Sequence, residues 1–208
     1  MRPVAATATE APAPSALRVV HTAPELDLLA AERAVRDLLV ALGQDPTSAH
    51  LADTPRRVAA AYGEMLTPRE FSLTTFPNDE GYDELVVARD IPVHSLCQHH
   101  LLPFTGVAHV AYLPGERILG LSKLARVVEM FARGLQVQER LTKQVADWLE
   151  AHLEPKGVGV VIEAEHLCMS LRGVQAHGCR TVTSALHGLL RHDARSRAEF
   201  FALSGVSA

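Results

Sequence analysis

The chain has 208 residues and a formal net charge of −4, from 20 lysines and arginines against 24 aspartates and glutamates. Hydrophobic residues make up 48% of it and charged residues 21%, which is ordinary for a globular domain. The negative balance argues against a general nucleic-acid binder, which is normally basic, and no apolar run approaches the roughly 18 residues that a membrane span needs. We expect one compact domain with an appended helical segment.

The first residues are rich in alanine, proline and threonine, without the continuous apolar run of a secretory signal. Residues 1–21 are therefore predicted to form a disordered tail. Three cysteines are an odd number that does not suggest a disulfide framework, so we expect free thiols in a reducing compartment. The expected localisation is cytoplasmic.

Residues 22–68 carry two helical patterns and are predicted to form an N-terminal helical segment. Thr22 and Glu25 have the spacing of a capping box ahead of an apolar stripe that ends at Gly43. Pro55 suits the first position of a second helix, because its missing N–H has no partner to lose there.

From residue 84 onward the pattern changes to short, valine-rich runs with two helical stretches between them. Strands are predicted at residues 84–93, 105–113, 157–165 and 179–185, and helices at residues 122–132 and 136–152. Helices flanked by pairs of strands indicate an α+β domain over residues 84–208, in which two helices pack on one side of an antiparallel sheet.

Two short segments combine cysteine and histidine at the ends of predicted strands. Cys97 and His100 are three residues apart, a spacing that lets a thiolate and an imidazole reach one ion from a single turn. Cys168 offers a third ligand. Three protein ligands with one open position are typical of catalytic zinc, whereas structural zinc usually has four. The alternative interpretation is two buried thiols and some surface histidines.

Further histidines and a further thiol surround these segments. His99 and His166 lie near the proposed ligands, and an imidazole with a pKa of about 6.5 can transfer protons near neutrality. The alternative is that either histidine only fills polar surroundings. Cys179 lies in a predicted strand without an adjacent histidine, so we expect a buried or half-buried free thiol.

Two polar groups suggest substrate binding. Ser122 is predicted to cap a helix that carries Lys123 and Arg126 near its start, where phosphate oxygens are favoured. Gln138 and Glu139 pair an amide with a carboxylate, and a carboxylate can accept two parallel N–H bonds of the kind that a guanine edge offers. The alternative in both cases is an ordinary solvated helix face.

Together these segments resemble GTP cyclohydrolase I. The resemblance spans roughly residues 25–205. The matching segments are DTPRRV at 53–58, CQHH at 97–100, GLSKLAR at 120–126, QVQERLT at 136–142, HLCM at 166–169 and RGV at 172–174.

The resemblance implies a tunnelling fold (T-fold), in which antiparallel sheets of several subunits close into a barrel. It implies a toroidal homodecamer with active sites at the subunit interfaces. Zinc is the implied cofactor and GTP the implied substrate, with neither a nucleic acid nor a membrane as partner. The implied reaction opens the imidazole ring of GTP by attack of water at C8, releases formate and recloses to 7,8-dihydroneopterin triphosphate, the first step of folate and pterin biosynthesis.

The resemblance also assigns a role to each candidate residue by its position. The implied zinc ligands are Cys97, His100 and Cys168. The implied catalytic residues are His99, His166, Ser122 and Gln138. The implied substrate-binding residues are Glu139, Gln138, Ser122, Lys123, Arg126, Arg172 and Arg57. In this scheme the histidines manage protons, Gln138 and Glu139 bind the guanine edge, and the basic residues bind the triphosphate, some of them from a neighbouring subunit.

Two positions depart from the family pattern, and two other functions stay open. Ala60 stands where some members carry a basic residue, so one phosphate contact is expected to be missing. Gln98 stands where the family commonly has glutamate, and the missing carboxylate could change metal affinity or rate. A related nitrile reductase would use a cysteine nucleophile and a nicotinamide cofactor without zinc. A non-catalytic relative would bind a nucleotide without turning it over. The complete set of two cysteines and one histidine favours the cyclohydrolase over both.

Overall fold

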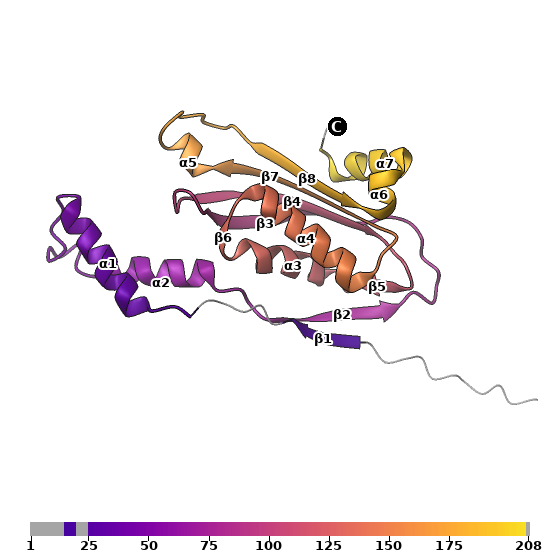
Figure 1. Ribbon diagram of the computed structural model, residues 1–208, viewed down its shortest axis with the longest axis horizontal. Helices are drawn as coiled ribbons and strands as arrows, with labels where there is room; N and C mark the ends of the chain where they lie inside the picture. Colours follow the sequence, from indigo (N-terminus) through magenta and orange to yellow (C-terminus); the bar gives the residue numbers. More distant parts are fainter. Residues whose placement is uncertain (1–14, 20–24, 207–208) are drawn as a thin grey trace, which may run out of the picture.

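The computed structural model describes residues 15–19 and 25–206, which form two sheets and seven helices (Figure 1). The strands are β1 (Ser15–Val19), β2 (Phe71–Pro77), β3 (Val86–Cys97), β4 (Pro103–Leu113), β5 (Arg117–Leu119), β6 (Leu135–Gln136), β7 (Gly157–His166) and β8 (Thr181–His187). The helices are α1 (Leu28–Ala41), α2 (Thr54–Leu66), α3 (Ser122–Ala132), α4 (Gln138–Leu153), α5 (Leu167–Ser170), α6 (Gly188–His192) and α7 (Ala194–Ser204). No helix in the described ranges is long and apolar enough to cross a membrane.

The larger sheet has five strands in the order β6-β3-β4-β7-β8. β3, β4, β7 and β8 pair antiparallel, which agrees with the four predicted strands, although β3 runs on to Cys97 and β7 to His166. The two-residue β6 pairs parallel with β3 instead, because the chain leaves α3 in the direction of β3. One face of the sheet contributes the main core, whereas Pro92, His94 and Val182 on the other face are exposed.

One face of this sheet is covered by α3 and α4. Their apolar residues, including Leu124, Val128, Leu141 and Leu149, form a single core cluster with inward-facing residues of β3, β4 and β7. Ser122 was predicted to cap α3, but it is the first helical residue, and the preceding Leu121 makes no side-chain cap. α3 runs from the β5 end of the molecule toward β6 (Figure 1).

The opposite face carries α6 and α7, which the sequence did not predict. Leu190 and Phe200 pack there against Ala111 and Val161. Gly159 allows this contact, since a Cβ at its position would lie 2.8 Å from both Leu190 and Phe200. The apolar positions of α7 have little helical periodicity, so its sequence gave a weak signal.

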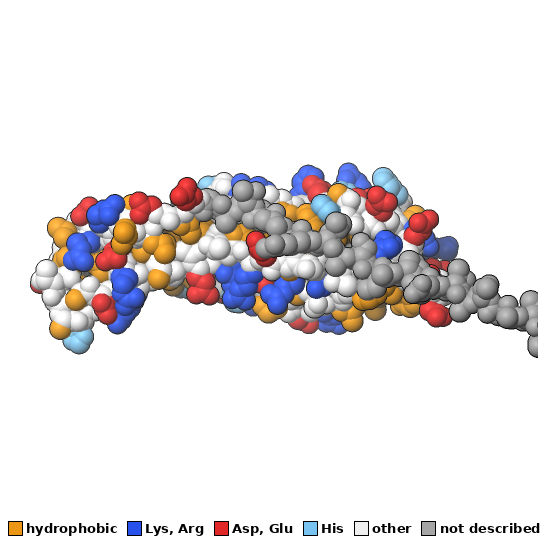
Figure 2. Space-filling model, turned by 90° about the horizontal axis from the view of Figure 1, so that it is seen from below, with side chains coloured by type: hydrophobic (Ala, Val, Ile, Leu, Met, Phe, Trp, Pro, Cys, Tyr) orange, Lys and Arg blue, Asp and Glu red, His pale blue; other side chains and the backbone are white. Residues whose placement is uncertain are grey.

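The N-terminal segment forms a helical pair, α1 and α2, that projects from the end of the larger sheet (Figure 1). α1 begins at Leu28 with Asp27 as its cap, whereas the proposed capping residue Thr22 lies outside the described residues. No residue of α1 is buried, and Leu29 is 69% exposed. Figure 2 shows hydrophobic side chains at the surface of this end of the molecule.

Part of the predicted N-terminal tail is ordered. β1, within residues 1–21, pairs antiparallel with β2, with Ser15 opposite Thr75 and Val19 opposite Phe71. β2 pairs in turn with β5 and so completes the smaller sheet. The remaining residues of the predicted tail lie outside the described residues.

Candidate active site

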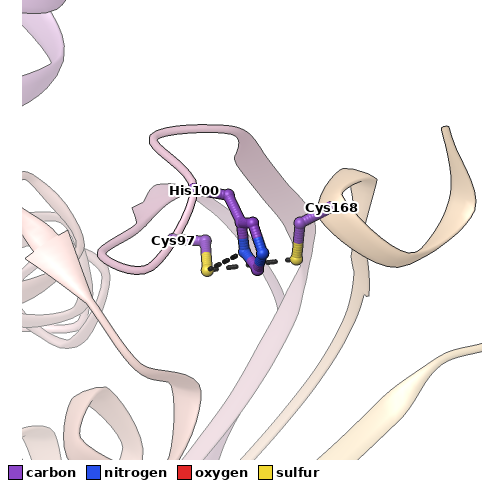
Figure 3. Close-up of side chains that lie close together, drawn as sticks. All are labelled: Cys97, His100 and Cys168. Atoms are coloured by element: carbon purple, nitrogen blue, oxygen red, sulfur yellow. Dashed lines mark hydrogen bonds between the residues drawn. The ribbon is translucent and has the colours of Figure 1, made fainter. Parts of the chain in front are cut away.

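Three ligand atoms converge at one end of the larger sheet (Figure 3). Cys97 is the last residue of β3, and the turn that follows it carries His100; Cys168 lies in α5, directly after β7. The turn is held by the Leu101 N–H, which donates to Cys97 O, and by the Cys97 N–H, which donates to Leu102 O, both at 2.9 Å. A hairpin turn and a strand end 71 residues apart in the sequence thus supply one cluster.

The distances within this cluster fit a tetrahedral zinc ion. Cys97 Sγ lies 3.9 Å from Cys168 Sγ and 3.8 Å from His100 Nδ1. Two thiolates on a tetrahedral zinc, each about 2.3 Å from the metal, are about 3.8 Å apart. Both cysteines are buried, whereas His100 is exposed, so the cluster has one side open to solvent. This is the donor set and the open geometry of a catalytic zinc site.

Cys168 is electrostatically unfavourable as a thiolate while no cation is bound. Burial, followed by the neighbouring Cys97, raises the pKa of the Cys168 thiol, and the Arg172 guanidinium opposes this rise. Arg172 also lies close to the metal cluster, with its Nη1 3.5 Å from His100 Nε2. A divalent cation would reverse the preference, because it stabilises both thiolates.

His166, the last residue of β7, is held from two sides. Its ring stacks on Phe104 of β4, with centroids 4.6 Å apart and planes 12° apart, and its Nε2 lies 2.8 Å from Gln138 Oε1. Burial lowers the pKa of His166, although the Glu139 carboxylate opposes the shift. At neutral pH the ring is therefore held mainly in its neutral form, with one nitrogen available to accept a proton.

Gln138 and Glu139, the first two residues of α4, differ in their surroundings. Gln138 is 1% exposed, and its amide nitrogen lies within hydrogen-bonding distance of Ile162 O, Thr181 O and Thr183 Oγ1. Its amide is thus committed to protein partners, although the sequence assigned it to the guanine edge. Glu139 is exposed and keeps its carboxylate at the surface.

A pocket of about 220 Å³ opens at the metal cluster. Its lining residues are Cys97, His99, His100, Gln136, Val137, Gln138, Glu139, His166, Cys168, Met169 and Thr181. His99 is exposed, and its Nδ1 lies 3.9 Å from Cys97 Sγ. Gln98 is also exposed, and its backbone N–H donates to Gln136 O. The structure thus brings together the predicted metal ligands, both predicted proton-transfer histidines and Gln138 with Glu139.

The predicted phosphate-binding residues lie outside this pocket. The C-terminal end of α3 adjoins the metal end of β3, where Ser95 Oγ donates to Ala132 O. Ser122 and Lys123 begin the same helix ten residues earlier, which at 1.5 Å per residue places them about 15 Å away along its axis. The length of α3 therefore separates Ser122 and Lys123 from the metal cluster of the same chain.

Of the three remaining predicted phosphate ligands, Arg172 lies beside the metal cluster, and the other two are engaged in surface ion pairs. Arg126 Nη1 lies 3.2 Å from a carboxylate oxygen of Glu129, and Arg57 Nη2 lies 3.1 Å from one of Asp53. Both pairs are exposed, so each arginine can exchange its partner for a phosphate at little cost. Neither residue lines the pocket at the metal cluster.

Sequence reasoning missed several residues that shape the site. Phe104 stacks on His166, and Thr142 and Thr183 contact Gln138 from α4 and β8. Phe104 and Thr183 lie outside the matching segments, and Thr142 lies within the segment 136–142 but was assigned no role, because each acts through strand register or helix packing. Cys179, expected to be at least half-buried, is instead exposed, because it precedes β8 in a loop.

The comparisons with known proteins agree with this geometry. A family model described as GTP cyclohydrolase I matches residues 31–205. GTP cyclohydrolase 1 of Aquifex aeolicus (strain VF5) is 54% identical over 172 residues, which cover 83% of this chain and 94% of that protein. GTP cyclohydrolase 1 of Mycolicibacterium gilvum (strain PYR-GCK) is 52% identical over 185 residues, which cover 86% and 91%. The chain belongs to the GTP cyclohydrolase I family.

Proposed function

We propose that the protein hydrolyses GTP to formate and 7,8-dihydroneopterin triphosphate. One observation carries the proposal: two thiols and an imidazole at tetrahedral spacing border the same pocket as two histidines and an exposed carboxylate. The net change is the addition of one water to GTP and the loss of one formate. Opening the imidazole ring and reclosing a six-membered ring both require proton transfers, and His99 and His166 are available at the pocket for these.

Zinc is the cofactor that this donor set fits. Cys97, His100 and Cys168 would hold it and leave one position open toward the pocket. Bound there, zinc supplies a Lewis acid and lowers the pKa of water to about 7. His99, with its Nδ1 3.9 Å from Cys97 Sγ, borders the same pocket as the three ligands.

The division of work among the remaining residues follows from their burial. Glu139, exposed at the start of α4, would accept two N–H bonds from the guanine edge, a charge-assisted pair. Gln138 is committed to protein partners and would act on His166 instead of on the base. His166, stacked on Phe104, would exchange protons with the opening ring through its free nitrogen.

A second copy of the chain would complete the site. Ligand pockets usually enclose about 300–1,000 Å³, whereas the pocket at the metal cluster encloses about 220 Å³. Along the axis of α3, Ser122 and Lys123 lie about one helix length from its metal end, and Arg126 lies about 9 Å from it. In a ring, the start of α3 of one subunit would meet the metal end of its neighbour, and its basic residues would bind the triphosphate there.

Two further features support a ring. β8 is an outer strand of the larger sheet, and such an edge offers unpaired backbone groups to a neighbouring subunit. α1 has no buried residue and leaves Leu29, Leu38 and Leu42 exposed, a face that association would cover. We propose the homodecamer that the sequence resemblance implied.

The decisive experiment measures metal content and GTP turnover in the same sample. We expect about one zinc per chain, formate release, and a fluorescent pterin after oxidation. Protein that contains no zinc and oxidises a reduced nicotinamide cofactor would favour the nitrile reductase. Zinc-loaded protein that yields neither formate nor pterin at saturating GTP would favour a nucleotide-binding relative without turnover.

A further inference from the structure

The turn that carries His100 contains a residue with left-handed backbone. Leu101, which directly follows His100, has a φ of +55°. Residues with a Cβ rarely adopt this conformation, because the Cβ lies too close to the carbonyl oxygen. Leu101 is 47% exposed, so core packing does not impose the conformation. His100 is exposed as well, whereas Cys97 and Cys168 are buried. Of the three metal ligands, His100 therefore depends most on the backbone of its own turn.

A tyrosine of the N-terminal helical segment contacts this turn. The hydroxyl of Tyr62, in α2, lies 2.9 Å from Leu101 O. A carbonyl oxygen only accepts hydrogen bonds, so the hydroxyl is the donor. The direction of this carbonyl is set by the ψ angle of Leu101, so a hydrogen bond to it favours one backbone conformation at that residue. A contact across 39 residues of sequence thus acts directly on the residue that follows a metal ligand.

α2 is itself joined to the catalytic domain, so it presents Tyr62 from a fixed position. Arg133, at the C-terminal end of α3, donates from Nη1 to Glu64 O at 2.6 Å and to Thr67 O at 3.3 Å. Both carbonyls lie at the C-terminal end of α2, where the helix offers them no N–H partner of its own in the usual pattern. The Nε of the same guanidinium lies 3.1 Å from Glu129. One arginine therefore links the ends of two helices.

We infer that Tyr62 is a positioning residue for the metal site: its hydroxyl stabilises the left-handed conformation of Leu101 and so holds His100 beside the two thiols. The inference rests on the proposed zinc site, whereas the hydrogen bond does not. At the start of the same turn, the Gln98 N–H donates to Gln136 O at 3.0 Å. The catalytic domain therefore holds the first half of the turn, and the N-terminal helices hold the second.

The test removes only the hydroxyl, by Tyr62→Phe, and follows the transfer of zinc to a chelator that changes colour on binding it. We expect zinc to leave Tyr62→Phe about three- to tenfold faster than the wild type, the equivalent of one net hydrogen bond. Tyr82→Phe is the matched control, because Tyr82 is exposed and precedes β3, whose far end carries Cys97. It should release zinc at the wild-type rate. If Tyr62 only supported the fold, the free energy of unfolding would fall while zinc release stayed unchanged, and the inference would be overturned.

A second variant shows whether the hydroxyl acts through Leu101. Asparagine adopts the left-handed conformation more readily than leucine, so the turn of Leu101→Asn should depend less on Tyr62. In that background Tyr62→Phe should accelerate zinc release by a smaller factor, and equal factors in both backgrounds would contradict the inference. Wild-type protein that takes up zinc but does not turn over GTP would refute the proposed reaction alone. Wild-type protein that takes up no zinc would refute the zinc site and this inference together.

Discussion

The two ends of α3 adjoin regions of very different character. At its C-terminal end lie the metal cluster and the buried amide of Gln138, whose nitrogen faces two backbone carbonyl oxygens. At its N-terminal end, Ser122 is exposed and Arg126 shares a surface ion pair. The first region is already organised within one chain, whereas the second has basic groups but no enclosing pocket.

This difference supports the proposal that the work of the site is divided between subunits. Metal binding and proton transfer need positions fixed to within a fraction of an ångström, and one sheet end supplies them. Phosphate binding needs positive charge and donors that tolerate movement, and an exposed helix start supplies these. A site built from both regions can therefore have a subunit interface between the metal cluster and the phosphate-binding residues.

The largest effect is expected at the metal cluster. Cys168→Ala removes one of three protein ligands, so zinc should be lost on dialysis and GTP turnover should fall by more than the roughly 10- to 100-fold that loss of an outer partner causes. His100→Ala should behave alike. Cys179→Ala is the matched control, because this thiol is free and exposed, and it should keep both zinc and turnover. Zinc retained at wild-type level in both ligand variants would disprove the assignment.

The second effect joins the two regions. Lys123→Ala should keep its zinc but lose most turnover, because a basic group for the triphosphate is missing. Mixing equal amounts of Cys168→Ala and Lys123→Ala chains under conditions of subunit exchange should restore about a quarter of wild-type activity, the fraction of interfaces with both intact halves. If both halves came from one chain, the mixture would stay as inactive as its components.

Much of the fold could be predicted from the sequence because its periodicity is strong. β4 and β7 are rich in valine and bounded by turns, and α4 places an apolar stripe on one face, so each was predicted within a few residues. β5 and β6 have three and two residues, which is too short for any period to show. α7 has almost no apolar periodicity, and it packs against β7 through Phe200, which lies at Gly159 beside Leu190 of α6.

The candidate site divides in the same way. Cys97, His100 and Cys168 could be predicted because metal ligands have characteristic types and spacings. Thr142 and Thr183 could not, since they meet only because α4 packs against β8, 41 residues further along the chain. Gln138 was placed at the guanine edge by its neighbour Glu139, but the sequence does not show that one side chain points inward and the other outward.

An intermediate effect is expected at Glu139, which lies at the pocket but does not contact the metal. Glu139→Gln replaces a charged acceptor by a neutral amide, so kcat/KM for GTP should fall by roughly 10- to 150-fold, the equivalent of ~1.5–3 kcal/mol for hydrogen bonds to a charged group. Zinc content should not change. The exposed Glu154 at the other end of α4 provides the control, because Glu154→Gln makes the same change far from the pocket. Zinc and activity falling in parallel would instead make Glu139 structural.

The smallest effect belongs to a residue outside both regions. His109 is buried in β4, and its Nδ1 lies 3.4 Å from the Asp90 N–H. Burial lowers the pKa of His109 below its ordinary 6.5; the carboxylates of Asp90 and Glu163 oppose the shift, and Arg89 adds to it. Because the unfolded chain binds this proton more readily, the contribution of His109 to stability is complete above pH 6.5 and is lost as the pH falls through the folded-state pKa.

His109→Asn tests this contribution, since asparagine can still accept from the Asp90 N–H but does not titrate. In urea unfolding at fixed protein concentration, the wild type should lose more free energy of unfolding than the variant when the pH is lowered from neutrality to below 6.5. The difference is limited to a single ionisation, so it should be small. Zinc content and GTP turnover at neutral pH should be the same in both proteins, because His109 contacts neither the metal cluster nor α3. A variant with the full wild-type pH dependence would assign that dependence to other groups. A variant that lost zinc would show that the two faces of β4 are coupled, and the separation between the metal end and the rest of the sheet would no longer hold.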